Sequence, residues 1–250
     1  MGNRVRRLAL AGVVSLVLVL ALGLGARTPV AGAPLAGAPL AGAPVAGAPL
    51  ARIVSRGPAS AHVVALTFDD AWDPAATGRI FATLRANGVA ATFFPVGKAV
   101  AAAPDLWRSI AQAGYPIANH SDTHPTLTSL SDEAVSREIV DARSTVERVT
   151  GRPMAPFLRP PNGAIDDRVR GIAERLGFAT IVMWAVASSD WTEPGAAAVV
   201  QRSLAGTDGS IVLLHAGPAS TVAALPAIIA GYRARGFSFV AVPQLLAAPD

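Results

Sequence analysis

The stretch Val63-Val64-Ala65-Leu66-Thr67-Phe68-Asp69-Asp70 decides the fold class of this 250-residue chain. Its first six residues are apolar or β-branched, which predicts a buried strand over 62–68, and the run stops at two adjacent carboxylates. Strands of this kind belong to sheets that are covered on both faces. Because α/β proteins place reactive groups where such strands end, we expect the two aspartates at a functional rim.

Four later apolar runs end in the same way, each at a residue with acid, base or ligand chemistry. The runs are 115–118 before His120 and His124, 156–158 before Arg159, 181–186 before Asp190, and 211–214 before His215. The chain has four histidines, and three of them stand at these strand ends. The pattern predicts a reaction site at one rim of an α/β sheet or barrel.

Strands alternate with helices along the rest of the chain. Strands are predicted near 62–68, 90–96, 115–118, 156–160, 179–186, 210–215 and 237–242, with helices over 75–87, 99–113, 131–149, 166–176, 195–205 and 220–234. This alternation indicates parallel strands joined by crossover helices, and seven repeats fit a barrel better than an open sheet. The predicted fold class is α/β, with one domain over 62–250.

The first 61 residues are predicted to lie outside that domain. Arg4, Arg6 and Arg7 precede an uncharged apolar run over 8–25, so residues 1–27 are predicted to be an export signal. The run is close to the length that spans a bilayer, and a retained membrane anchor is the alternative. Residues 28–61 contain four Ala-Gly-Ala-Pro repeats and are predicted to be a linker. Both alternatives place the domain outside the cytoplasm, extracellular or at the cell wall.

Composition excludes several classes of function. The formal net charge is +4, and no basic stripe with interleaved aromatic residues is present, so no nucleic-acid partner is expected. The chain has no cysteine, which excludes disulfides, thiolate metal sites and a cysteine nucleophile.

The paired aspartates and the paired histidines are candidates for a metal site. Taken alone, Asp69 and Asp70 also fit a structural role as a turn or helix cap. His120 and His124 add two imidazoles, and two imidazoles with one carboxylate bind a divalent metal while leaving positions open for water and substrate. The combination of these strand ends favours a divalent-metal site.

The other strand ends supply an arginine, a carboxylate and an imidazole. Arg159 is suited to hold a carboxylate in its ionised form, and the backbone N–H of Asn162 could face a developing oxyanion. His215 is a candidate proton donor, and Asp190 would raise its pKa and select its tautomer. The structural alternatives are a surface arginine beside an ordinary turn and a core histidine.

The order of these motifs resembles that of the polysaccharide deacetylases, the NodB-homology proteins of carbohydrate esterase family four. The motifs are Thr67-Phe68-Asp69-Asp70, His120-Ser121-x-x-His124, Arg159-Pro160-Pro161-x-Gly163, Asp190-Trp191 and Leu213-Leu214-His215. The resemblance covers about residues 62–245. It implies a distorted (β/α)7 barrel, a divalent metal that is commonly zinc, and hydrolysis of N-acetyl groups on amino-sugar polymers such as peptidoglycan or chitin.

The resemblance also implies a role for each site residue. Asp69 looks like the catalytic base held by Arg159, and His215 looks like the general acid tuned by Asp190. The implied metal ligands are Asp70, His120 and His124. The backbone N–H of Asn162 would stabilise the oxyanion, and Trp191 and Leu213 would form an apolar wall for the acetyl methyl group.

The chain departs from the family pattern at three places. Ala71-Trp72 stands where the family usually has Gly-Pro, Asn162 where it commonly has Tyr, and Ala187 where it often has Asp. None of these changes removes a proposed ligand or acid–base residue, but they bear on the substrate. One alternative is therefore the same site acting on a different amide or an O-acetyl ester. Another is a wall-glycan-binding module without catalysis.

Overall fold

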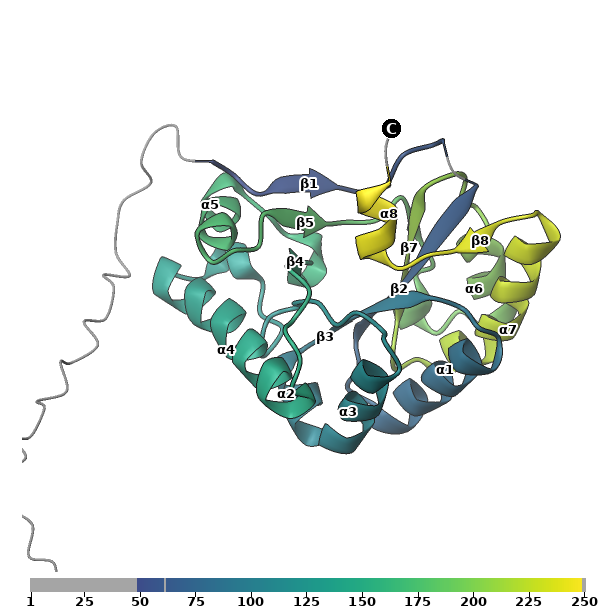
Figure 1. Ribbon diagram of the computed structural model, residues 1–250, viewed down its shortest axis with the longest axis horizontal. Helices are drawn as coiled ribbons and strands as arrows, with labels where there is room; N and C mark the ends of the chain where they lie inside the picture. Colours follow the sequence, from purple (N-terminus) through teal and green to yellow (C-terminus); the bar gives the residue numbers. More distant parts are fainter. Residues whose placement is uncertain (1–48, 61, 249–250) are drawn as a thin grey trace, which may run out of the picture. The chain divides into compact units, whose positions relative to one another are not determined.

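The computed structural model describes residues 49–60 and 62–248, which form a mainly parallel α/β fold (Figure 1). β2 (Val63–Asp70) lies between β3 (Ala91–Pro95) and β7 (Ser210–His215), and β6 (Val186–Ala187) pairs with the other side of β7. β8 (Ser238–Phe239) pairs with the start of β2. All of these pairings are parallel, as the alternation of strands and helices predicts.

Three short strands form a second parallel sheet. Its order is β1 (Arg52–Val54), β5 (Thr180–Val182) and β4 (Phe157–Leu158). Isolated parallel bridges, Phe93 to Ile117 and Asn119 to Leu158, connect this sheet to the larger one. The α/β class is confirmed, and the ladder of strands is interrupted between the two sheets.

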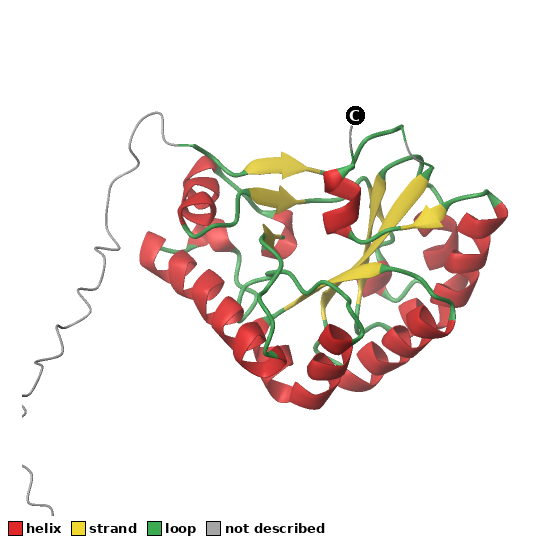
Figure 2. Ribbon diagram, in the orientation of Figure 1, coloured by secondary structure: helices red, strands yellow, loops and turns green. Residues whose placement is uncertain are grey.

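Most helices lie on the outside of the strands (Figure 2), whereas the C-terminal helix packs against residues of both sheets, among them Ala65, Val182 and Ile211. Their bounds are α1 Pro74–Ala86, α2 Gly97–Ala102, α3 Pro104–Gln112, α4 Asp132–Thr150, α5 Asp167–Arg175, α6 Ala196–Ser203, α7 Ala219–Ala234 and α8 Val242–Ala247. Side-chain oxygens of Asp73, Ser131 and Asp166 accept backbone N–H groups at the starts of α1, α4 and α5. These caps satisfy amides that a helix start leaves without a partner.

The structure divides two elements that the sequence predicts as continuous. The helix expected over 99–113 is α2 followed by α3, because Pro104 starts a new helix and disfavours the helical conformation at Ala103. The strand expected over 179–186 is β5 and β6, which belong to different sheets. The run over 115–118 contributes one isolated bridge, from Ile117 to Phe93, and no ladder.

The folded part of the chain includes residues that the sequence assigns to the linker over 28–61. Ala51 is fully buried, and Arg52 is in register with Thr180. The export signal or anchor over 1–27 and the repeats up to residue 48 lie outside the described residues. Among the helices that the structure describes, none is long and apolar enough to cross a membrane.

The register of the central strands brings reactive residues together. Asp69 on β2 is the register partner of His215 on β7. Leu66 and Phe68, earlier on β2, are fully buried in the core. Because the strands are parallel, their carboxyl ends meet at one rim, where the apolar interior gives way to polar side chains.

Candidate active site

A cavity of about 430 Å³ opens at this rim. Its lining residues are Asp69, Asp70, His120, His124, Pro160, Asn162, Gly163, Trp184, Trp191, Leu213 and His215. Eight of the ten site residues predicted from the sequence are among them. The other two, Arg159 and Asp190, are fully buried and bond to Asp69 and His215, which line the cavity.

The loops around the cavity contain non-glycine residues with a left-handed backbone. Among the described residues, the non-glycine positions with positive φ are Asp70, Ala71, Ser121, His124, Asn162, Ser189 and Glu193. Such conformations cost about 1–3 kcal/mol each, and they persist only where surrounding contacts impose them. Their concentration in loops that carry predicted site residues is typical of a functional site.

Asp70, His120 and His124 direct three donor atoms to one place, all within 4.8 Å of one another. Oδ1 of Asp70 lies 3.3 Å from Nε2 of His120 and 3.2 Å from Nε2 of His124. Nδ1 of His120 donates a hydrogen bond of 2.7 Å to the carbonyl oxygen of Arg159. Because a carbonyl only accepts, the neutral ring of His120 has an unprotonated Nε2, as metal ligation requires.

Oδ1 of Asp70 is buried and has no hydrogen-bond donor among the described residues, although both imidazoles are near it. Burial raises the pKa of Asp70, but contact with His120 and His124 in their protonated forms outweighs burial and holds this pKa far below its usual range. Contact with Asp70 raises the pKa of His124. A buried oxygen without a hydrogen-bond donor and two imidazole nitrogens together form a ligand set that suits a divalent cation. These residues therefore fit the predicted metal.

Asp69 lies beside this cluster and has a different principal partner. It is 2% exposed, and Nη1 of Arg159 donates to its Oδ1 at 2.6 Å. Its Oδ2 lies 3.8 Å from Nε2 of His120. Asp69 and Arg159 therefore form a buried ion pair at the edge of the three-ligand cluster, the contact that the family resemblance implies.

Arg159 is held from behind by backbone carbonyls. Nε donates to the carbonyl of Val182 at 2.9 Å, and Nη2 donates to that of Met183 at 3.2 Å. Nη1 also donates to Oγ1 of Thr67 at 2.9 Å. Burial lowers the pKa of Arg159, and Asp69 opposes that shift. The carbonyls of Val182, at the end of β5, and of Met183 thus fix the orientation of the guanidinium that binds Asp69.

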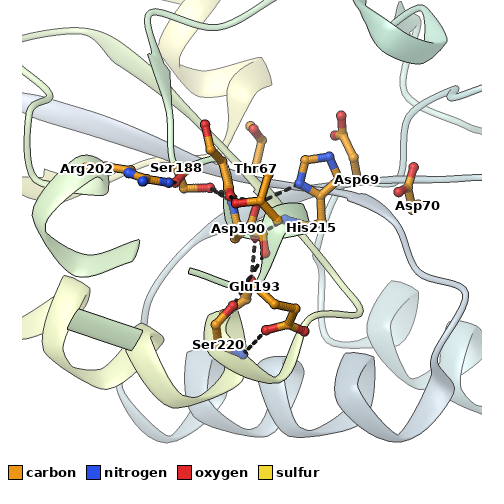
Figure 3. A network of polar contacts seen from close by, with 12 residues as sticks. Thr67, Asp69, Asp70, Ser188, Asp190, Glu193, Arg202, His215 and Ser220 are labelled. Atoms are coloured by element: carbon orange, nitrogen blue, oxygen red, sulfur yellow. Dashed lines mark hydrogen bonds and ion pairs between the residues drawn. The ribbon is translucent and has the colours of Figure 1, made fainter. Parts of the chain in front are cut away.

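Asp190 and His215 form a second buried pair (Figure 3). Nδ1 of His215 donates to Oδ1 of Asp190 at 2.8 Å, and the backbone N–H of His215 donates to Oδ2 at 2.7 Å. The hydroxyl of Ser188 donates to Oδ1 at 2.8 Å, and the hydroxyl of Thr221 donates to Oδ2. Both oxygens of this fully buried carboxylate therefore have two donors each.

The pair sets the proton affinity of His215. Burial raises the pKa of Asp190, but the contact with His215 outweighs burial and lowers it. Burial lowers the pKa of His215, whereas Asp190, Asp69 and Asp70 together raise it above its usual value. His215 therefore keeps its proton to a higher pH than an ordinary histidine does. Because Nδ1 is bonded to Asp190, Nε2 is the nitrogen available for proton exchange.

The mouth of the cavity is apolar on one side. Trp191 is 53% exposed, and the centroid of its ring lies 5.2 Å from that of His215. Leu213 is buried and lines the same cavity. Asn162 has a φ of 59°, and its side chain donates to Oγ1 of Thr126 at 3.0 Å. Gly163 next to it leaves no room for a side chain, because a Cβ there would lie 2.9 Å from the Trp184 ring.

The positions that depart from the family pattern have different surroundings. Ala71 is buried, whereas Trp72 leaves a 53% exposed indole at the end of β2, two residues after Asp70. Ala187 is exposed on β6. None of these side chains occupies the place of a metal ligand or of the buried ion pairs.

The sequence did not predict the side chains that do not line the cavity but hydrogen-bond the residues and loops that do. Ser188 and Thr221 donate to Asp190. Glu193 accepts the backbone N–H groups of Ala219 and Ser220 at the start of α7 (Figure 3).

Glu138 on α4 is a further side chain of this kind, because it binds the backbone of the histidine loop. A sequence signal existed for it, since Glu138 is three residues after buried Val135 and four before buried Ala142 on the predicted helix. Thr221 and Ser188 carry no comparable signal.

Comparison with known proteins identifies the class that this fold and site define. The sequence profile of the polysaccharide deacetylase family matches residues 56–181. A peptidoglycan-N-acetylglucosamine deacetylase of Bacillus cereus is 34% identical over 194 residues, which cover 76% of this chain and 90% of that protein. A chitooligosaccharide deacetylase of Sinorhizobium fredii is 34% identical over 207 residues, which cover 77% and 96% respectively. The chain belongs to the polysaccharide deacetylase family, whose named relatives are hydrolases of carbon–nitrogen bonds.

Solved structures agree with this family. A peptidoglycan N-acetylglucosamine deacetylase in complex with 4-naphthalen-1-yl-N-oxidanyl-benzamide has a TM-score of 0.75 and 31% identity, covering 80% of this chain and 94% of that one. A wild-type CE4 family pseudoenzyme from Bacillus anthracis has a TM-score of 0.73 and 28% identity, covering 78% and 69%. Because an enzyme and a pseudoenzyme share the fold, catalysis in this chain has to be argued from its own side chains.

Proposed function

We propose that the protein removes N-acetyl groups from an amino-sugar polymer of cell-wall type, peptidoglycan or a chitin-like glycan. One observation carries the proposal. A cavity brings the unpaired Oδ1 of Asp70 and two histidines together with the Asp69–Arg159 pair and with His215. A ligand set for a cation, a carboxylate base and an imidazole acid are the groups that metal-assisted amide hydrolysis needs.

Asp70, His120 and His124 are the proposed holders of a divalent cation, and zinc suits two imidazoles and one carboxylate. When bound, such an ion lowers the pKa of water and polarises a carbonyl oxygen. The protein contributes the orientation of its ligands, because the bond from His120 to the Arg159 carbonyl selects the tautomer that leaves Nε2 free.

Asp69 is the proposed general base, which accepts a proton from the attacking water. Its Oδ1 accepts from Nη1 of Arg159 at 2.6 Å, so the guanidinium fixes the orientation of this carboxylate. Its Oδ2 is the oxygen left for the proton, and it lies on the side of His120. The two oxygens of one carboxylate thus have separate tasks.

His215 is the proposed general acid, which delivers a proton from Nε2 to the leaving amine. Amide hydrolysis needs this step because an unprotonated amine is a poor leaving group. Asp190 keeps His215 protonated and fixes its tautomer through Nδ1. The backbone N–H of Asn162 is the proposed oxyanion donor, and Trp191 and Leu213 form the proposed wall for the acetyl methyl group.

The polymer and the location of the enzyme are inferred from two sources. The relatives described above are named for peptidoglycan N-acetylglucosamine and chitooligosaccharides. The basic and apolar start of the sequence is that of an exported protein, retained by an anchor or released by cleavage. An extracellular or wall-associated domain would meet such polymers directly.

The direct test is acetate release from chitooligosaccharides and from peptidoglycan fragments, before and after treatment with a chelator and after zinc is restored. We expect release that the chelator abolishes and zinc restores. Release that is insensitive to the chelator would overturn the metal role. An O-acetylated xylan in the same panel tests the ester alternative. Glycan binding without turnover under any divalent metal would identify a non-catalytic wall module.

A further inference from the structure

The loop that carries both histidine ligands has no regular secondary structure, and side chains bind its amides. Ser121 and His124 both have left-handed backbones, with φ of 64° and 66°. The N–H of Ser121 donates to Oδ1 of Asn119, and the N–H of His124 donates to Oγ of Ser121, both at 2.9 Å. No strand ladder imposes this conformation, so it depends on hydrogen bonds to neighbouring groups. The N–H groups of Gly97 and Lys98 donate to the carbonyls of Ser121 and Asp122 at 3.0 Å, and the loop amides need acceptors in turn.

The two amides in the middle of the loop share one acceptor from another element. Oε2 of Glu138 accepts from the N–H of Asp122 at 2.9 Å and from the N–H of Thr123 at 2.8 Å. Oε1 of Glu138 accepts from the hydroxyl of Thr123 at 2.7 Å. A carboxylate that accepts backbone N–H groups makes charge-assisted bonds, which are about twice as strong as neutral ones.

The helix that carries Glu138 is long, capped and packed against the core. α4 has 19 residues, is capped by Ser131, and buries Val135 and Ile139 in the core. The carbonyl of Ile139 also accepts from Nδ2 of Asn119 at 2.9 Å. Two consecutive residues of α4 therefore hold the start and the middle of the histidine loop, on either side of His120.

We propose that Glu138 is a positioning residue of the metal centre. It holds the backbone of Asp122 and Thr123 so that His120 and His124 face Asp70 before a cation binds. Without this carboxylate, the entropy of ordering the loop would oppose cation binding. This inference rests on the proposed function, because it takes the three-ligand cluster to be the metal site.

The test compares Glu138→Ala with a matched control on the same helix, Asp141→Ala, which removes an exposed carboxylate one residue beyond Val140. Zinc affinity is measured by competition with a chromophoric chelator, and the melting temperature of each metal-free protein is recorded. We expect Glu138→Ala to weaken zinc binding about 10–100-fold, the range typical of partners that orient metal ligands. Asp141→Ala should stay within about twofold of the wild type.

A second readout separates positioning from general stability. Cobalt(II) absorption reports ligand geometry, and we expect Glu138→Ala to change that spectrum when cobalt is subsaturating, whereas Asp141→Ala leaves it unchanged. If Glu138→Ala does not fold, Glu138→Gln and Thr123→Val replace it, because each removes part of the same contact. Intermediate losses of zinc affinity are expected for both.

The outcomes distinguish this inference from the proposed function. Wild-type zinc affinity in Glu138→Ala, or in both milder variants, would overturn the positioning role. An equal loss in Asp141→Ala would overturn it as well, because the effect would then come from helix charge. A wild-type protein that binds neither zinc nor cobalt would instead overturn the proposed metal centre itself.

Discussion

Asp70 and Asp190 are carboxylates on opposite sides of the same site, and their surroundings are opposite. Asp190 is fully buried, and each of its oxygens accepts two hydrogen bonds from protein groups. Asp70 is more exposed, yet its Oδ1 has no donor although two imidazole nitrogens lie 3.2 and 3.3 Å away. The first carboxylate is satisfied by the protein alone, and the second has a place for a cation.

This difference divides the site into a proposed metal side and a proposed proton side. The proton side, Asp190 with His215, is organised without any ligand, so changes to it should alter pKa values and rates. The metal side, Asp70 with His120 and His124, should report its changes in cation binding. Asp69 lies between them, since it is the register partner of His215 and its Oδ2 lies 3.8 Å from Nε2 of His120.

The largest effect is expected from Asp70→Asn, which replaces an anionic ligand with a neutral one. Because a bound cation stabilises the transition state by several kcal/mol, activity should fall on the order of 10³-fold or more. Metal content, measured by elemental analysis after dialysis against buffered zinc, should fall in parallel. His120→Ala should behave in the same way, and normal metal content in either variant would contradict the ligand assignment.

Asp69→Asn should separate catalysis from cation binding. Loss of the base is expected to reduce acetate release about 10²–10³-fold, while zinc affinity remains near that of the wild type. Removal of one partner from the buried ion pair with Arg159 should also destabilise the fold by about 3–5 kcal/mol. Urea unfolding of the metal-free protein measures that change, and rates are compared only where the variant is folded. Lost zinc affinity would show that Asp69 is also a ligand.

Asp190→Asn should affect the proton side alone. Asp190 raises the pKa of His215, so its loss lowers that pKa and the protonated acid disappears at a lower pH. The alkaline limb of the kcat profile should move toward acid, with about a tenfold or greater loss near pH 8 and a smaller loss near pH 5. Zinc affinity serves as the control. An unchanged alkaline limb would mean that His215 is not the acid.

The smallest effect is expected from Thr221→Val, which removes one of the two donors to Oδ2 of Asp190. A hydrogen bond to a charged group contributes about 1.5–3 kcal/mol to the free energy of unfolding, so a loss near the lower end is expected. Activity should fall only a few-fold, and zinc affinity should not change. Thr221→Ser keeps the hydroxyl and should restore most of the stability; if it is as unstable as the valine variant, packing of α7 explains the loss.

The main features of the fold could be predicted because they depend on local patterns. The run over 63–68 is apolar until Asp69, and this pattern alone indicates a buried strand whose end is reactive. The split at Pro104 and the separation of β5 from β6 were missed. The helix boundary at Pro104 could have been predicted, because the residue before a proline disfavours the helical conformation. The separation of β5 from β6 could not, because it depends on which sheet each strand joins.

The chemical groups of the site could be predicted to the same extent. Histidines and carboxylates at successive strand ends mark the rim, and their motif order matches a known family. Helix periodicity places Glu138 on the buried face of α4, but the partners of Glu138 and Thr221 could not be predicted, because these contacts join residues 15 to 31 positions apart through loops of irregular backbone. No periodicity records which amide or oxygen such a side chain will meet.

The sequence by itself determined the α/β class, the order of the reactive residues and the chemistry available to them, because strand ends and residue types are local properties. Only the tertiary structure decided that Asp190 is fully bonded while Oδ1 of Asp70, beside two imidazoles, lacks a hydrogen-bond donor among the described residues. It also placed Arg159 against Asp69 across 90 residues of chain. Hydrogen bonding between distant segments depends on how strands and helices pack. That packing selects which oxygen keeps a lone pair available for a cation.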